Sequence, residues 1–442
     1  MSRVIVVGAG MAGLSAGYRL QAAGHDVTVL ERSTVPGGSV RSERHGSYLV
    51  DTGPDAMNTS YTRALGLAHE VGLSDSIVVS SRQVNVIRGG RPIDFDGARP
   101  LSLLRSSLLS NRGRLQLAAG YLRTRRQIRD LDPYDLARYA EAGAQPAEQF
   151  AYRKFGREAA DWVLDPLVRV FAGTGLRHTN AASVLGAIAV GAYDPVNLLG
   201  GLAELPAAVA ARLDTRCEVT VAAVCETPRG VTVTTTDEDL SADACLLAVM
   251  YEEASDIWPA LREAAPEFGQ TLQPIPLISI TLGYDTAVGT DAYPVLVPTS
   301  EHPDVLLGFI QQHKAPDRAP AGHTLITIYT EAFATPRYLD RSDEELTSWA
   351  DGIITSWYPA LKGHRDLATC TRWGRTAYVP DPGFYARTRD LRSALPRGRI
   401  HVSSALFGSG SIERAVLGGE RAASHVGKCL AEREESDARP AR

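Results

Sequence analysis

The chain opens with a run of apolar, β-branched residues from Val4 to Val7. Such a run is hydrophobic on both faces, as is a strand inside a parallel sheet. It stops at a glycine-rich stretch, residues 8–13, after which Leu14 and Tyr18 recur with helical spacing. A second apolar run, residues 27–30, follows. The pattern predicts a strand, a tight turn, a helix and a second strand at the start of the chain.

Strand and helix patterns recur along the rest of the chain. Residues 342–357 have the pattern of an amphipathic helix, and Ser342 and Glu345 at its start form a predicted capping box. A further helix is expected at 207–213. Strands are expected at 219–224, 231–235, 242–249, 277–284, 324–329 and 399–403.

The glycines of the first turn have the spacing G-x-G-x-x-G. Gly8 permits the tight turn, Gly10 lets a pyrophosphate approach the backbone, and Gly13 lets helix and strand pack closely. Met11 and Ala12 lie between them, at the helix N-terminus, where unpaired N–H groups can face a phosphate. The spacing alone is a weak signal, but here strand, helix and strand frame it. The framed motif predicts a dinucleotide-binding turn.

An acidic residue ends the second strand, and a second glycine motif follows it. Glu31 lies 18 residues beyond Gly13, where its carboxylate can accept hydrogen bonds from an adenosine ribose and would repel a 2′-phosphate. The chain then runs through three segments that together suggest a flavin cofactor: Arg32, Gly37-Gly38-Ser39-Val40-Arg41 and Gly53-Pro54-Asp55-Ala56.

With these segments the chain resembles the flavin-dependent amine oxidase superfamily, and it is closest in pattern to the protoporphyrinogen and coproporphyrinogen oxidases. The resemblance implies that these segments wrap FAD, with Arg41 neutralising the pyrophosphate or approaching the flavin edge; an ordinary surface arginine is the alternative. It also implies a contact of Val221 with adenine, where a plain strand-core valine is the alternative. Near the C-terminus, Gly408, Ser411, Ile412 and Ala415 match the closing motif, in which a helix N-terminus meets the flavin ring.

The resemblance implies an α/β fold: a Rossmann-like FAD-binding domain of the glutathione-reductase type, with a discontinuous substrate domain of mixed sheet and helices. We expect the FAD-binding domain to comprise residues 1–75, 200–255 and 371–432. A helical substrate insertion is expected at 76–199 and a mixed-sheet substrate domain at 256–370. Residues 433–442 are predicted to be a frayed tail.

Composition fits a globular protein. The 442 residues are 44% hydrophobic and 22% charged, and 46 basic against 51 acidic side chains give a net charge of −5. We therefore expect no nucleic-acid partner. The five cysteines form no C-x-x-C pair, so neither a disulfide framework nor a metal site is predicted. The apolar start is too short for a signal peptide, and we expect a cytoplasmic protein.

The family chemistry is hydride removal from a C–H or C–N bond by the flavin, with dioxygen as the implied electron acceptor. Many amine oxidases place a lysine near the flavin on a central strand, and residues 276–284 contain none. Residues 399–423 contain no cysteine for a covalent flavin link, so we expect non-covalent FAD. Ser404-Ala405 and Glu413-Arg414 depart from the porphyrinogen-oxidase pattern and put a haem-pathway substrate in doubt. No catalytic side chain and no oligomeric state are assigned.

The expected substrate is a small, hydrophobic or cyclic organic molecule. Trp373, Tyr378 and Tyr385 are candidate substrate contacts, with plain core positions as the alternative. Other readings of the function are an amine oxidase or carotenoid-type desaturase, a mutase using reduced flavin, and a non-enzymatic binding module like the Rab GDP-dissociation inhibitors. The leucine- and arginine-rich segment 99–129 is expected to be either a solvated helix or a peripheral membrane contact.

Overall fold

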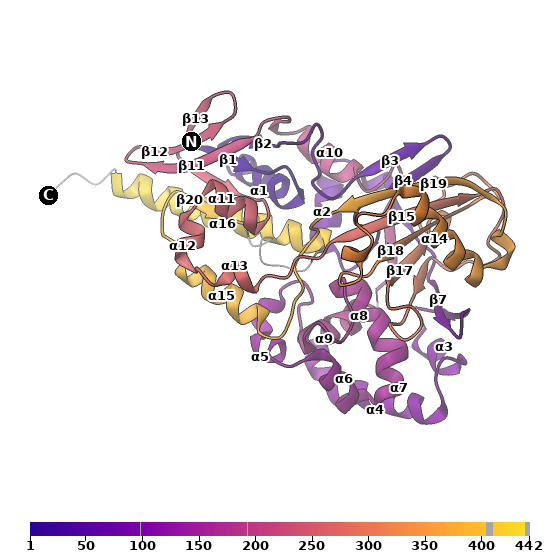
Figure 1. Cartoon of the computed structure of the whole chain (residues 1–442). Helices are drawn as coiled ribbons and strands as arrows, with labels where there is room; N and C mark the ends of the chain where they lie inside the picture. Colours follow the sequence, from indigo (N-terminus) through magenta and orange to yellow (C-terminus); the bar gives the residue numbers. More distant parts are fainter. Residues whose placement is uncertain (98, 192, 404–409, 438–442) are drawn as a thin grey trace.

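The computed structural model describes residues 1–97, 99–191, 193–403 and 410–437. Two lobes, each built on a sheet, lie side by side, and a helical layer lies below them in the view of Figure 1. Within the described residues, no helix is both long enough and apolar enough to cross a membrane.

The first lobe is built on a five-stranded parallel sheet in the order β10-β2-β1-β14-β20. The strands come from three distant parts of the chain, as expected for a discontinuous Rossmann-like domain. Its strands are β1 (Arg3–Val7), β2 (Asp26–Leu30), β10 (Asp214–Arg216), β14 (Ala244–Leu247) and β20 (Ile400–Val402).

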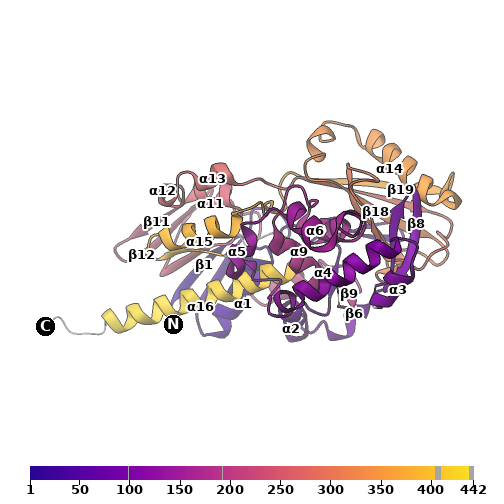
Figure 2. The ribbon, with the colours of Figure 1, turned by 90° about the horizontal axis from the view of Figure 1, so that it is seen from below.

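Two long helices cover one face of this sheet. Helix α1 (Met11–Ala22) follows the glycine turn, and α16 (Ile412–Asp437) crosses under the sheet beside it (Figure 2). The crossing is close, because a Cβ atom on Gly419 would lie 2.2 Å from the carbonyl oxygen of Ala12. Helix α16 continues to Asp437, so residues 433–437 are helical rather than frayed.

A small antiparallel sheet lies on the opposite face, where β11 and β12 contribute apolar side chains to the core. The predicted strands at 219–224, 231–235 and 242–249 correspond to β11, β12 and β14, and the structure adds β13. The bounds are β11 (Val221–Thr227), β12 (Gly230–Thr235) and β13 (Asp239–Ala242).

The second lobe holds a seven-stranded mixed sheet in the order β19-β15-β18-β17-β16-β7-β8. Neighbours are antiparallel except for β16 and β7. The predicted strands at 277–284 and 324–329 are its β15 and β18. The strands are β7 (Gln83–Arg88), β8 (Arg91–Asp96), β15 (Leu277–Tyr284), β16 (Pro294–Leu296), β17 (Val305–Ile310), β18 (Thr324–Thr330) and β19 (Arg365–Trp373).

Helix α14 (Asp343–Trp357) packs against this sheet through Leu346, Ala350 and Ile354. Its predicted capping box is present: the Ser342 hydroxyl accepts from the Glu345 N–H, and the Glu345 carboxylate accepts from the Ser342 N–H. Strands β7 and β8 belong to the same sheet although they come from segment 76–199, for which the sequence suggests helices. Their alternating apolar residues pair locally as a hairpin and then extend the sheet through β16.

The helical layer carries most of the rest of segment 76–199, including a π-helical turn at Ala160–Leu164. Its helices are α3 (Pro100–Arg105), α4 (Asn111–Arg129), α5 (Ala140–Gly143), α6 (Ala147–Phe155), α7 (Arg157–Ala159), α8 (Asp165–Ala172) and α9 (Ala181–Val190).

Shorter elements connect the lobes. The strands are β3 (Ser42–His45), β4 (Tyr48–Asp51), β5 (Met57–Asn58), β6 (Ile77–Val79) and β9 (Pro195–Leu198). The helices are α2 (Thr62–Glu70), α10 (Glu204–Ala210), α11 (Tyr251–Ile257), α12 (Ala260–Ala264), α13 (Phe268–Thr271) and α15 (Phe384–Ala394).

Candidate functional site

A single large cavity of about 1970 Å³ runs from the glycine turn of the parallel sheet to the helical layer and the mixed sheet. Pockets for one small ligand usually measure about 300–1,000 Å³, so this cavity has room for a cofactor and a substrate together. Most of the nominated site residues lie on its wall.

The glycine turn forms one end of the cavity. A Cβ atom on Gly13 would lie 1.9 Å from the carbonyl oxygen of Gly8, so only glycine allows the helix to start this close to the strand. Gly10 is the N-cap of α1 and faces open space, with no side chain capping the helix. The N-terminus of α1 therefore presents backbone N–H groups to the cavity, beside Gly10, Met11 and Ala12.

Glu31 stands at the end of β2, on the cavity wall. Its carboxylate accepts hydrogen bonds from the backbone N–H groups of Ala9 and Ser33, both at 2.9 Å. These bonds fix the carboxylate beside the glycine turn, and a carboxylate has further lone pairs for a ligand hydroxyl. Arg32 also lines the cavity, but its side chain is largely exposed.

The Gly37-Gly38 loop packs directly on the glycine turn. Both glycines have positive φ angles, 119° and 61°, which residues other than glycine rarely adopt. The N–H of Gly37 donates to the carbonyl oxygen of Ala9 at 2.8 Å. Arg41 donates from Nε to the carbonyl oxygen of Gly38 at 2.9 Å, and both Arg41 and Ser39 line the cavity. The loop thus continues the glycine-lined wall.

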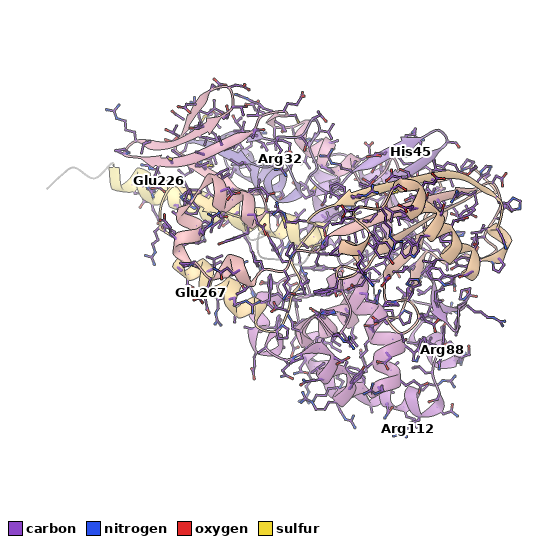
Figure 3. All side chains as sticks on the ribbon, in the orientation of Figure 1. Arg32, His45, Arg88, Arg112, Glu226 and Glu267 are labelled. Carbon is purple, nitrogen blue, oxygen red and sulfur yellow. The ribbon has the colours of Figure 1, made fainter. Side chains whose placement is uncertain are left out.

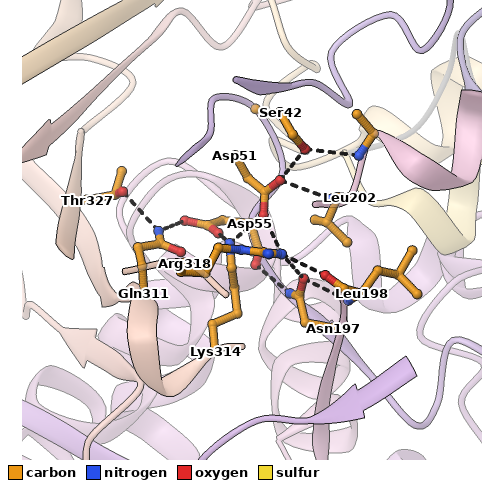
Figure 4. A network of polar contacts seen from close by, with 12 residues as sticks. Ser42, Asp51, Asp55, Asn197, Leu198, Leu202, Gln311, Lys314, Arg318 and Thr327 are labelled. Carbon is orange, nitrogen blue, oxygen red and sulfur yellow. Dashed lines mark hydrogen bonds and ion pairs between the residues drawn. The ribbon is translucent and has the colours of Figure 1, made fainter. Parts of the chain in front are cut away.

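The run Gly53-Pro54-Asp55-Ala56 lines the cavity next to Ser39. A Cβ atom on Gly53 would lie 1.7 Å from the Ser39 carbonyl oxygen, so the two loops meet backbone to backbone. The Asp55 carboxylate accepts from Lys314 and from Gln311 at 2.5 Å (Figure 4). It also accepts from the Tyr329 hydroxyl at 2.8 Å. Its oxygens are used within the protein, so Asp55 holds this run in place.

A buried ion-pair network surrounds Asp55 (Figure 4). Lys314 pairs with Asp51 at 2.6 Å and also with Asp55, and Arg318 approaches Asp51 at 3.3 Å. Burial alone would raise the pKa of Asp51, but the positive charges of Lys314 and Arg318 outweigh it and hold the pKa below its ordinary value. Lys314 is absent from the described cavity wall, so its ammonium group serves this network and not the cavity.

The closing segment reaches the cavity from the other end of the chain. Ser411, Ile412 and Ala415, at the start of α16, line the wall, as does Val221 from β11. The Glu413 carboxylate points elsewhere and accepts from the backbone N–H groups at the start of α2. Gly408 lies outside the described residues.

Of the three aromatic residues predicted to contact substrate, two line the cavity and one does not. Trp373 lines the cavity, and its indole N–H donates to the carbonyl oxygen of Thr52 at 2.7 Å, which fixes the ring beside the Gly53 run. Tyr385 also lines the cavity. Tyr378 does not: it is fully buried, and its hydroxyl donates to Glu252 at 2.6 Å and accepts from the Tyr251 N–H. The structure places Tyr378 off the cavity wall, in the core position that the sequence left as the alternative, and its hydroxyl anchors α11.

The far half of the cavity has a mostly apolar wall that single-sequence motifs do not reveal. Its wall includes Leu103, Leu117, Trp162, Leu167, Phe171, Leu296, Leu307 and Phe309. These residues come from the helical layer and the mixed sheet, and each is an apolar residue of the kind found in any protein core. The π-helical turn at 160–164 is a local feature of this wall that indicates a functional site, because such turns often occur there.

A family model described as flavin containing amine oxidoreductase matches residues 11–427. Over 173 residues the chain is 30% identical to protoporphyrinogen oxidase 2 of Arabidopsis thaliana, a match that spans 38% of this chain and 32% of that enzyme. Over 183 residues it is 27% identical to coproporphyrinogen III oxidase of Staphylococcus aureus, spanning 39% of this chain and 37% of that enzyme. These matches span about a third of the length of either relative.

The fold is shared more widely than the sequence. Cyclohexylamine oxidase from Brevibacterium oxydans superposes with a TM-score of 0.76 at 16% identity, over 97% of this chain and 99% of that chain. At this identity the likeness concerns the fold alone: a flavoprotein architecture with a Rossmann-like domain and a second, substrate-side domain.

Proposed function

The chain belongs to the flavin containing amine oxidoreductase family, and on that premise we propose that it is a FAD-dependent oxidoreductase that removes a hydride from a carbon atom, bonded to carbon or to nitrogen, of a hydrophobic or cyclic organic substrate. The single observation that carries this proposal is the continuous cavity. One end is a glycine-lined cradle at a helix N-terminus, and the other has a mostly apolar wall.

The cradle fits FAD in its chemistry. The uncapped N-terminus of α1 would hold the pyrophosphate, Glu31 the ribose, and the Gly37-Gly38 loop the backbone of the cofactor. Val221 would lie against adenine, and the start of α16 against the flavin ring. None of the five cysteines lines the described cavity, which supports non-covalent binding.

When bound, FAD supplies a ring that accepts the hydride and passes the electrons on, with dioxygen as the proposed acceptor. The protein's own side chains position the substrate and exclude water. Trp373 is fixed by its bond to Thr52, and Tyr329 by its bond to Asp55. Burial and the nearby Asp55 raise the pKa of Tyr329 well above its ordinary value, so its hydroxyl stays protonated.

The mouth of the cavity supports a lipophilic substrate. Tyr121, Leu122, Val170 and Tyr193 line the cavity and are also 40–59% exposed.

Tyr121 and Leu122 lie on α4, which carries six arginines and no acidic residue. Arg112, near its start, lies at the lower edge of the molecule in Figure 3. This combination supports peripheral contact with an anionic membrane, which flotation with phosphatidylglycerol vesicles would test; recovery of all protein in the vesicle-free fraction would contradict it.

The experiment for the proposed function is anaerobic mixing of the flavin-loaded protein with porphyrinogens, amines and polyenes. Bleaching by a porphyrinogen or another cyclic substrate, with recovery in air, is the expected result. Bleaching by amines alone would favour an amine oxidase, and bleaching by polyenes alone a carotenoid-type desaturase. Activity only after dithionite reduction would favour a mutase. A protein that takes up no flavin would favour a binding module.

A further inference from the structure

Three side chains able to bind a metal meet where the last strand of the parallel sheet passes under the last helix. His401 lies at the centre of β20, and His425 and Cys429 lie on α16. One ligand atom from each can be chosen such that all lie within 4.8 Å of one another. The Sγ atom of Cys429 lies 3.8 Å from Nε2 of His425, and the two imidazole rings meet edge to face, 5.2 Å apart.

The fold places these residues together for simple geometric reasons. His425 and Cys429 are four residues apart, so they share one face of α16. Ile400 and Val402, on either side of His401, pack into the core on the opposite side of the sheet. Because side chains alternate along a strand, His401 points to the side that α16 covers.

His401 is 9% exposed and makes no hydrogen bond within the described part of the chain. Its ring nitrogens therefore have no competing hydrogen-bond partner in that part of the chain, so a lone pair can face a metal ion. The charged groups around the cluster are of both signs: Glu226 and Arg433 act on His401, and Glu432 and Arg433 act on Cys429.

We propose that His401, His425 and Cys429 bind a divalent cation of the zinc class. Two imidazoles and one thiolate are ligands that zinc prefers, and bonds of about 2.0–2.3 Å in a tetrahedron put ligand atoms about 3.3–3.8 Å apart. The 3.8 Å between Sγ and Nε2 fits that spacing. Water completes the fourth position. On binding, the Cys429 thiol releases its proton to solvent, and no oxidation or reduction takes place.

The site would tie β20 to α16 across the segment that joins them. The residues that follow β20 lead to Ser411 and Ile412, which line the cavity. A metal at this site therefore stabilises the part of the chain that closes the cavity wall, without touching the cavity itself. Its binding does not depend on the proposed function being correct.

The test is titration of the chelator-treated, flavin-loaded protein with Co²⁺, whose ligand-field bands at about 600–700 nm lie beyond flavin absorption and report tetrahedral coordination. One equivalent of Co²⁺ should develop these bands, and Zn²⁺ should displace it and raise the melting temperature. Cys429→Ser and His425→Gln should each lose the bands and the thermal shift. Cys225→Ser, at an exposed cysteine of β11, should keep both.

Both replaced residues lie at the helix surface or near it, so circular dichroism serves to confirm that the variants fold. The proposal is overturned if the unaltered protein develops no bands with Co²⁺. It is equally overturned if the bands and the thermal shift survive in Cys429→Ser and His425→Gln. A failure of flavin reduction in the substrate library would leave the Co²⁺ result unaffected, so the two proposals fail separately.

Discussion

The Nζ atom of Lys314 lies 2.6 Å from a carboxylate oxygen of Asp51, and neither side chain has any exposure to solvent. Asp51 ends strand β4, just before the Gly53 run of the cavity wall, whereas Lys314 follows β17 of the mixed sheet. The pair therefore joins the glycine-lined side of the cavity to the mixed sheet through two buried charges.

Replacing Lys314 with methionine should destabilise the protein by about 3–5 kcal/mol, because it leaves the buried carboxylates of Asp51 and Asp55 short of a counter-charge. Urea unfolding measures the change. Lys362→Met is the matched control, since Lys362 is exposed, and it should shift stability by no more than about 0.5 kcal/mol. Equal effects of the two substitutions would show that the network contributes little.

Stability should fall in acid partly through Asp51. The folded-state pKa of Asp51 lies below its ordinary value of 3.8. The unfolded chain therefore takes up a proton first, so this contribution is complete above about pH 5 and is lost as the pH falls further. Urea unfolding at several values from about pH 2.5 to 6 should give a shallower pH dependence for Lys314→Met than for the unaltered protein. An identical slope would contradict the assignment.

Gly10→Ala should weaken FAD binding by tenfold or more, about 1.4 kcal/mol, and leave the fold intact. The added Cβ meets no protein atom within 4 Å and points into the open space where a pyrophosphate would lie. Fluorescence titration of the apoprotein with FAD measures the affinity. Gly352→Ala, in α14 and equally unobstructed, should bind FAD normally. Unchanged affinity in Gly10→Ala would place the pyrophosphate elsewhere.

Trp373 and Tyr378 should behave differently although they are five residues apart. Trp373→Phe removes the bond to Thr52 and reshapes the cavity wall, so we expect kcat/KM to fall roughly tenfold with whichever substrate bleaches the flavin. Tyr378→Phe should leave kcat/KM unchanged and reduce stability by about 1–3 kcal/mol, because Glu252 loses a buried donor. A lower kcat/KM for Tyr378→Phe together with an unchanged kcat/KM for Trp373→Phe would instead place Tyr378 in the substrate site.

Local patterns were enough to predict the parallel sheet and the glycine-lined end of the cavity. The β-branched runs, the turn at Gly8 and the capping box at Ser342 all depend on neighbours in sequence, and the structure confirms them. The substrate end could not be predicted in this way. Its wall joins Trp162 and Phe171 to Phe309, which lie far apart in sequence and resemble ordinary core residues.

Asp55 and His401 illustrate the same limit. Asp55 sits in a motif that suggests cofactor contact, yet its carboxylate is used by Lys314 and Gln311, partners that no short-range pattern identifies. His401 acquires His425 and Cys429 as neighbours only because α16 folds back over β20. The spacing of the cysteines in the sequence does not predict that cluster.

The most direct test of the central claim is the absorption spectrum of the gently purified protein before and after denaturation. The cradle predicts a band at about 450 nm, one equivalent of FAD released into the supernatant on denaturation, and a melting temperature that rises when FAD is restored to the apoprotein. A colourless protein whose melting temperature does not respond to FAD would contradict the account.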